Sequence, residues 1–316
     1  MWAIARSCIG RLVIALTVLV AVFAVTFVVM RLAPGGPFDR MDQLPPEVAA
    51  NLEVRYGLDQ PLPVQFGRLL GGYLTGDLGP SLTFAPGRTV REVLEATLPV
   101  SLELGLYALM VALLVGGGLG ILAGRRPGGW LDVSVSGLSL VVISASIIVV
   151  ATLMRAFFIR PEGPFVLGGF DSWRNKLLPS LTLGLAYGAL LVRLVRANVA
   201  DRVAAEVGRG AMARGVSPRR AFYAYVVPEA LIPMLSYMGA VVAAMLTGSF
   251  VVETIFAVPG AAALFVEGAQ ARDYPLVMAA IMVYTGLLVA LNLLCEWLQT
   301  ILDPRLRAAT RREGEP

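Results

Sequence analysis

The stretch from Asp201 to Pro233 reads DRVAAEVGRGAMARGVSPRRAFYAYVVPEALIP, and it is the longest amphipathic, arginine-rich run in a chain that is otherwise mostly apolar. Hydrophobic segments that are candidates to cross a bilayer flank it on both sides. Because positive charge between spans marks the cytoplasmic side of a membrane protein, we expect this stretch to meet a partner in the cytoplasm.

The composition of the chain favours a membrane protein. Of its 316 residues, 57% are hydrophobic and only 15% are charged, whereas soluble domains carry about 25% charged residues. The chain has no histidine, which excludes histidine-based acid–base catalysis and most zinc sites. Lys176 is the single lysine and a leucine follows it, so a phosphate-binding G-K-[ST] loop is excluded. Cys8 and Cys295 both lie in apolar segments and are interpreted as small hydrophobic residues.

Six stretches have the length and apolarity of membrane-crossing helices, for which about 20 residues are needed. They are Leu12–Met30, Leu104–Ala123, Val133–Met154, Leu177–Val192, Ala230–Val252 and Pro275–Cys295. The first is longer than the apolar part of a signal peptide and lacks a cleavage site, so it is interpreted as a retained span. The fourth is short, and we expect it to extend past Arg193. The predicted fold class is an all-α polytopic membrane protein with six transmembrane helices.

The distribution of charge gives the orientation. The central loop from Arg193 to Pro228 holds seven arginines against two acidic residues, whereas the segment Ala33–Ala96 holds five arginines against eight acidic residues. By the positive-inside rule the central loop and both termini are predicted to be cytoplasmic. The predicted organisation is an N-terminal end with the first span (1–32), an extracytoplasmic segment (33–96), a five-helix core (97–307) that contains the central loop (201–233), and a polar cytoplasmic tail (308–316).

The extracytoplasmic segment is rich in proline and glycine and too short to sustain a large core of its own. We expect short helices there, one of them over Glu47–Gly57 with Gly57 as its C-terminal cap. A poorly ordered loop is the alternative.

The central loop has the pattern of a helix, a tight turn and a second helix. Val203–Arg214 is predicted to form a short helix whose small residues let another protein approach its backbone closely. Gly215 suits the turn because glycine adopts positive φ without strain. Ser217 is a suitable N-cap for the second helix, with Pro218 at its first position. An amphipathic helix that lies among lipid headgroups is the alternative interpretation.

Motifs in and beyond this loop resemble those of ATP-binding-cassette (ABC) importer permeases, in the version of the oligopeptide and dipeptide permease B subunits. In the loop these are Ala211-x-Ala213-x-Gly215, Pro228 and Ala230-Leu231-Ile232-Pro233, which resemble the EAA loop of that family. Elsewhere they are Arg31–Phe38, Leu44–Glu47, Gly76–Ser81, Leu235–Gly239, Thr247–Ser249, Val252–Phe256, Pro259-Gly260, Arg272–Tyr274 and Asp303–Arg305. The resemblance covers residues 10 to 307. Met212 departs from it, because the family usually has a basic residue at that position.

The resemblance implies the type I ABC importer permease fold and a transport subunit without a catalytic site or cofactor of its own. ATP and Mg²⁺ would be bound by two partner ATPase subunits, a homologous second permease would complete the channel, and an extracytoplasmic binding protein would deliver peptide. Transport would proceed by alternating access in the plasma (inner) membrane of a bacterium. The residues implied in ATPase coupling are Val207, Arg209, Ala211, Met212, Ala213, Arg214, Gly215 and Ser217.

Three residues of the fifth predicted span are candidates for the outer gate or the transport pathway, namely Glu253, Tyr237 and Thr247. Glu253 and Glu103 fall at predicted outer helix ends, where a structural hydrogen bond is the alternative role. Other solutes, such as dipeptides or nickel chelates, remain alternatives within the family. A secondary transporter would need coupling acids at mid-membrane, and an intramembrane enzyme would need a catalytic motif; the sequence shows neither.

Overall fold

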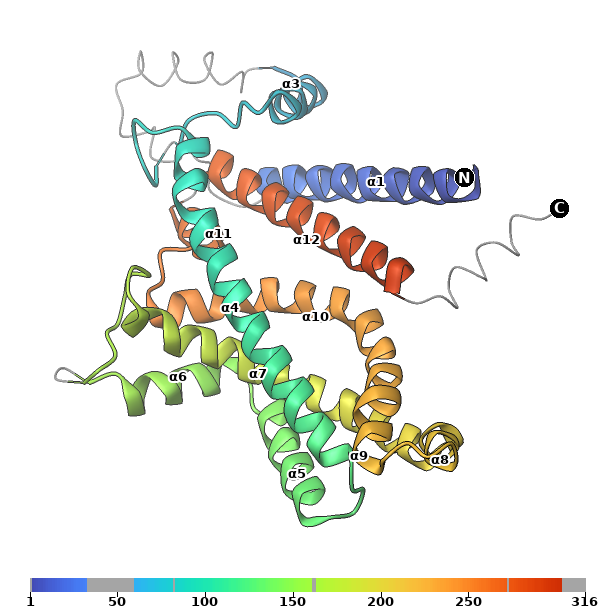
Figure 1. Ribbon diagram of the computed structural model, residues 1–316. Helices are drawn as coiled ribbons and strands as arrows, with labels where there is room; N and C mark the ends of the chain where they lie inside the picture. The colour runs from blue at the N-terminus through green and yellow to red at the C-terminus, as the bar shows by residue number, and fades with distance from the viewer. Residues whose placement is uncertain (1, 33–59, 82, 161–162, 272, 303–316) are drawn as a thin grey trace. The chain divides into compact units, whose positions relative to one another are not determined.

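The computed structural model describes residues 2–32, 60–81, 83–160, 163–271 and 273–302, and these are helical almost throughout (Figure 1). Within them, five helices are long and apolar enough to cross a membrane: α1 (Trp2–Leu32), α4 (Val90–Gly124), α7 (Trp173–Ala204), α10 (Val227–Phe256) and α12 (Tyr274–Leu302). The pair α5 (Trp130–Ser144) and α6 (Ile147–Phe158) makes a sixth span if the two are counted together. The all-α polytopic prediction is confirmed.

The shorter elements are α3 (Leu62–Thr75), α8 (Glu206–Ala213), α9 (Pro218–Ala221), the π-helix η2 (Phe222–Val226) and α11 (Ala261–Gln270). The chain divides into two compact units. The first contains Val100–Pro259 and the last part of α12. The second combines α1 from Ser7 onward, α3 and the first turns of α4 with α11 and the first half of α12.

The first unit is built around α7, which packs against α5, α6 and α10. Its core is aliphatic and includes Leu183, Leu191, Val195 and Val199 of α7, all of them fully buried. Burial on several sides explains why α7 continues for 32 residues, past the exposed Arg193, as the sequence predicted for the fourth span.

A seam of small residues brings α4 close to α7. Gly116, Gly120 and Gly124 recur every fourth residue and therefore lie on one face of α4. A Cβ atom added to Gly120 would lie 2.7 Å from Cβ of Val195, and one added to Gly124 would lie 2.7 Å from Cβ of Val199. The two backbones approach each other because these positions have no side chain, as in other membrane-helix pairs.

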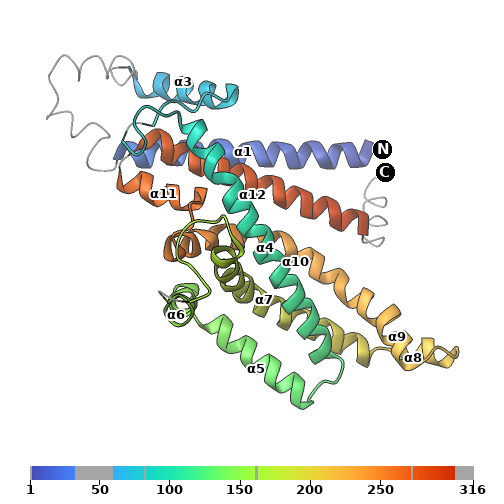
Figure 2. The ribbon, with the colours of Figure 1, turned by 60° about the vertical axis from the view of Figure 1, so that its left-hand side comes forward.

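The third predicted span, Val133–Met154, consists of two helices rather than one continuous helix. Helices α5 and α6 meet at an angle of 102° (Figure 2). The break falls at Ala145 and Ser146, which both have extended backbone, and the Ser146 hydroxyl accepts a hydrogen bond from the Ile148 amide at 3.4 Å. A serine that caps a new helix in this way competes with continuation of the old one.

The second unit is held together by an aromatic cluster and a buried carboxylate. Phe23 of α1 packs edge-to-face against Phe66 and Tyr73 of α3, with ring centroids 5.2 and 5.4 Å apart. Asp273 is fully buried and accepts hydrogen bonds from the Ser81 hydroxyl (2.6 Å) and from the amides of Thr83, Phe84 and Leu276. Burial, with Asp273 nearby, raises the pKa of Tyr73.

Helix α3 is one short helix of the segment that was predicted to be extracytoplasmic, and α4 begins at Val90, inside the same segment. The predicted helix over Glu47–Gly57 lies outside the described residues.

Candidate functional site

The central loop folds into a compact corner between α7 and α10, in which α8 contacts α7, α9 and η2 (Figure 2). Gly215 has φ +84° and ends the turn after α8, as predicted. Ser217 occupies the N-cap position with Pro218 after it, although its side chain makes no capping hydrogen bond.

One helix over Val203–Arg214 was predicted, and this was wrong. Val203 belongs to α7, where it packs against the core of the first unit, and Ala205 interrupts the helix with extended backbone (φ −71°, ψ 166°). Helix α8 therefore begins at Glu206, and a single residue joins it to α7.

The predicted coupling residues differ in solvent exposure. Ala211 is fully buried, on a helix that contacts α7, α9 and η2. The other described members are exposed, and they are Met212, Ala213, Arg214, Gly215 and Ser217. The side chains of Val207 and Arg209 lie outside the described residues. The corner thus presents small and basic groups outward, joined by the exposed Tyr223 and Tyr225 of η2.

An ion pair joins the two stems of this corner, which are the last turn of α7 and the first turn of α10. Nη1 of Arg202, in the last turn of α7, lies 2.7 Å from Oε1 of Glu229, in the first turn of α10. The two residues are 27 positions apart, and sequence reasoning did not pair them because opposite charges at that separation have no characteristic spacing.

A second brace ties α7 to α5. Arg196 binds the buried Asp132 through two hydrogen bonds, from Nε (2.7 Å) and Nη2 (2.6 Å). Bidentate pairs of this kind fix geometry as well as adding energy. The same carboxylate accepts the Gly128 amide at 2.8 Å and so also holds the turn between α4 and α5. In that turn the Arg125 guanidinium lies 5.5 Å from the ring centroid of Phe222, at the start of η2.

The candidate pathway residues of α10 lie on different faces. Tyr237 and Thr247 are exposed, whereas Glu253 is fully buried and accepts a hydrogen bond from the Ser101 hydroxyl at 2.7 Å. Glu253 therefore has the structural hydrogen bond that was its alternative role, and its place at an outer gate stays a prediction. Glu103 pairs with Lys176 at 2.6 Å between α4 and α7.

The exposed face of α10 differs in composition from those of its neighbours. Past the first turn, its exposed described residues recur at helical spacing and are Tyr237, Ala240, Ala244, Thr247 and Thr254. Exposed leucine, valine and isoleucine, by contrast, occur on α1, α4, α5 and α6. The exposed face of α10 thus carries alanine, threonine and a tyrosine, whereas those helices expose branched aliphatic side chains.

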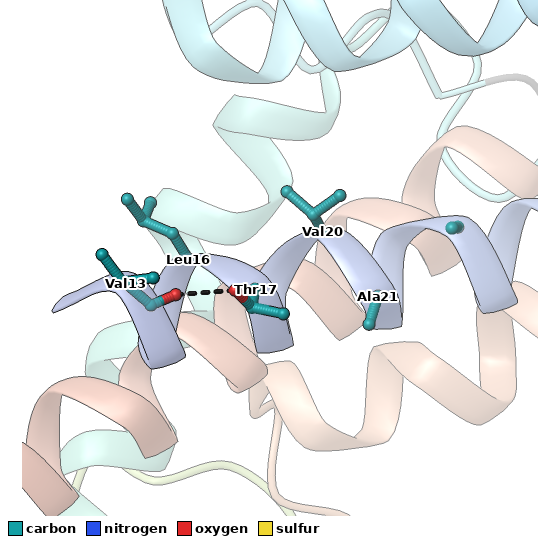
Figure 3. A pocket seen from close by; sticks show the side chains of 6 residues that line it. Val13, Leu16, Thr17, Val20 and Ala21 are labelled. Atoms are coloured by element: carbon teal, nitrogen blue, oxygen red, sulfur yellow. Dashed lines mark hydrogen bonds between the residues drawn. The ribbon is translucent and has the colours of Figure 1, made fainter. Parts of the chain in front are cut away.

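A hollow along α1 has the character of a lipid-facing surface. It is lined by Val13, Leu16, Thr17, Val20, Ala21 and Ala24 (Figure 3). The Thr17 hydroxyl donates to the carbonyl of Val13 at 2.8 Å, within its own helix. A hollow so apolar does not suit a polar solute.

Comparison with known proteins points in one direction. The family described as "Binding-protein-dependent transport system inner membrane component" matches residues 116–308. The chain is 34% identical over 303 residues to the dipeptide transport system permease protein DppB of Bacillus subtilis (strain 168), covering 96% of this chain and 98% of that protein. It is 34% identical over 295 residues to the oligopeptide transport system permease protein OppB of Salmonella typhimurium, covering 93% and 96% of the two chains.

A solved structure, described as "Crystal structure of an amino acid ABC transporter with histidines", superposes with a TM-score of 0.52 at 16% identity. The superposition covers 66% of this chain and 93% of the other. At that identity the likeness concerns the fold alone.

Proposed function

Because the chain belongs to the family of binding-protein-dependent transport system inner membrane components, we propose that it is the permease subunit of an ABC importer that moves peptides into the cytoplasm. Family membership carries the proposal, and relatives that match over nearly their whole length are permeases of dipeptide and oligopeptide transport systems. Oligopeptides are the proposed substrate, and a dipeptide or another small solute is the alternative.

In this proposal α8 is the coupling helix, and one ATPase subunit docks on the exposed surface around Met212, Ala213 and Arg214. The buried Ala211 supports the assignment, because one side of α8 is covered by its neighbours while Met212, Ala213 and Arg214 remain exposed to a partner. The ATPases bind ATP and Mg²⁺, and the permease has no catalytic site of its own. A second permease and an extracytoplasmic binding protein complete the importer. The chain lies in a bacterial plasma membrane with the corner and both termini in the cytoplasm.

The exposed face of α10, with its alanine, threonine and tyrosine side chains, is the proposed wall of the transport pathway. Helices that face hydrocarbon expose large aliphatic side chains, as α1 does, whereas polar side chains of membrane-spanning helices mostly face the bundle interior or a water-filled cavity. Tyr237 and Thr247 belong to this wall. Glu253, on the buried side of the same helix, is proposed to act at the outer gate only through the packing of α10 against α4, where Ser101 binds it.

Co-purification and a stimulation assay test the proposal. The chain is purified from membranes in mild detergent, and ATP hydrolysis is measured with empty and with peptide-loaded binding protein. We expect two ATPase subunits and a second permease to co-purify, and hydrolysis to rise with the peptide-loaded form. A complex without ATPase, or hydrolysis that ignores the loaded binding protein, would contradict the importer assignment. Stimulation by another solute in place of peptide would replace the substrate class.

A further inference from the structure

Movement of α8 can reach the membrane-spanning helices by two routes. On one side Ala205 alone joins α8 to α7. On the other side the turn at Gly215, α9 and η2 lead into α10. If the end of α7 and the start of α10 moved independently, a displacement of α8 could move one of these helices and leave the other in place. Only part of the displacement would then reach the membrane-spanning helices.

The ion pair between Arg202 and Glu229 bridges these stems next to α8. Arg202 lies three residues before Ala205, and Glu229 lies in the first turn of α10. Their side chains are only 32% and 21% exposed, so the pair is partly shielded from water and salt. The charge of Arg202 also suits the end of α7, because a cation is favoured at a helix C-terminus.

We propose that Arg202 and Glu229 are positioning residues that clamp α7 and α10 together, so that a displacement of α8 moves both helices as one lever. The inference rests on the proposed function, since it concerns how α8 drives the spans. It assigns to this pair a role in the efficiency of coupling that is separate from docking of the ATPase, which takes place on the exposed surface of α8.

The test separates coupling from assembly. Arg202→Glu, Glu229→Arg and the double exchange are made in the full complex and reconstituted into proteoliposomes. At equal amounts of assembled complex, the ATP hydrolysed per peptide imported is measured. We expect each single variant to bind the ATPases and to raise this ratio about tenfold, within the range of coupling between sites. The double exchange should recover most of the loss but not all, because a carboxylate in place of Arg202 opposes the dipole at the C-terminal end of α7.

Arg91→Glu is the control for charge reversal at an exposed ion pair. It disrupts an ion pair of the same length, 2.7 Å to Glu95, far along the sequence from α8, and should leave the ratio unchanged. If a charge-reversed single variant fails to assemble, Arg202→Gln, Glu229→Gln and their double variant are measured instead. For a clamp, the double variant is then no worse than either single variant.

The clamp would be overturned by single variants that import at the wild-type ratio, or by a double exchange no better than the singles. A loss of transport that merely follows the amount of assembled complex would also overturn it, since the role would then be structural. Failure of the proposed function looks different, because the wild-type complex itself would then lack an ATPase or peptide-stimulated hydrolysis.

Discussion

A methyl group added to Gly120 should force α4 and α7 apart. Its Cβ atom would lie 2.7 Å from Cβ of Val195 and 3.0 Å from the Val192 carbonyl oxygen. Neither neighbour is the end of a flexible side chain, so the helices themselves must separate. Overpacking of this kind costs about 1–3 kcal/mol, and we expect the upper part of that range because Gly116 and Gly124 make the same close approach and would be loosened together.

Gly118→Ala is the matched control, because Gly118 lies in the same helix and has no atom within 4 Å of an added Cβ. Both substitutions gain the same helix propensity, about 1 kcal/mol. The difference between their unfolding free energies therefore measures the cost of the close contact between α4 and α7. We expect Gly120→Ala to be less stable than Gly118→Ala by about 2 kcal/mol, measured by unfolding in mixed micelles with increasing denaturing detergent. Equal stability of the two variants would refute the close α4–α7 packing.

Three further predictions concern the braces and the turn. Asp132→Asn leaves Arg196 with one good acceptor and should lower the free energy of unfolding by about 2 kcal/mol, which is measured as a lower melting temperature of the purified complex. An unchanged melting temperature would show that the Arg196–Asp132 pair is redundant. Asp273→Asn removes the charged acceptor of the Thr83 and Phe84 amides and should speed amide hydrogen exchange at these two residues by at least tenfold, since about 1.4 kcal/mol corresponds to that factor. Asp77→Asn, at an exposed carboxylate bound to the Gly79 amide, should leave their exchange unchanged. Gly215→Pro should abolish peptide import while membrane insertion persists, because proline cannot adopt φ +84°. Gly210→Ala is its control, because a Cβ atom added to Gly210 has no other atom within 4 Å. Normal uptake by Gly215→Pro would exclude the coupling-helix assignment.

Local chemistry accounts for what could be predicted from the sequence. Gly215 is recognisable because few other residues adopt positive φ without strain. The extension of α7 past Arg193 follows because an arginine at the edge of the apolar region can place its charge in water. Both features depend on residues close together in the chain.

The features that were not predicted depend on tertiary contacts, or on competition between two local structures that the same residues can form. Val203 fits the pattern of α8 as well as that of α7, and packing in the first unit decides between them. Ser146 lies in an apolar run that would suit a straight helix, yet it caps a new one. The pairs Arg202–Glu229 and Arg196–Asp132 join residues 27 and 64 positions apart, and only the folded chain brings them together.

The contacts of α7 determine which parts of the first unit can move separately. Near its N-terminal end Lys176 pairs with Glu103 of α4, and further along Val195 and Val199 pack into the glycine seam of the same helix. Arg196 and Arg202 then fix it to α5 and α10. Interiors packed at this density transmit strain rather than absorb it, so α4, α5, α7 and α10 respond to a push on α8 as a group. The regular helix of the first unit is interrupted at the 102° bend between α5 and α6 and at the π-helical turn η2 that precedes α10, and interruptions of the π type are frequent at functional sites.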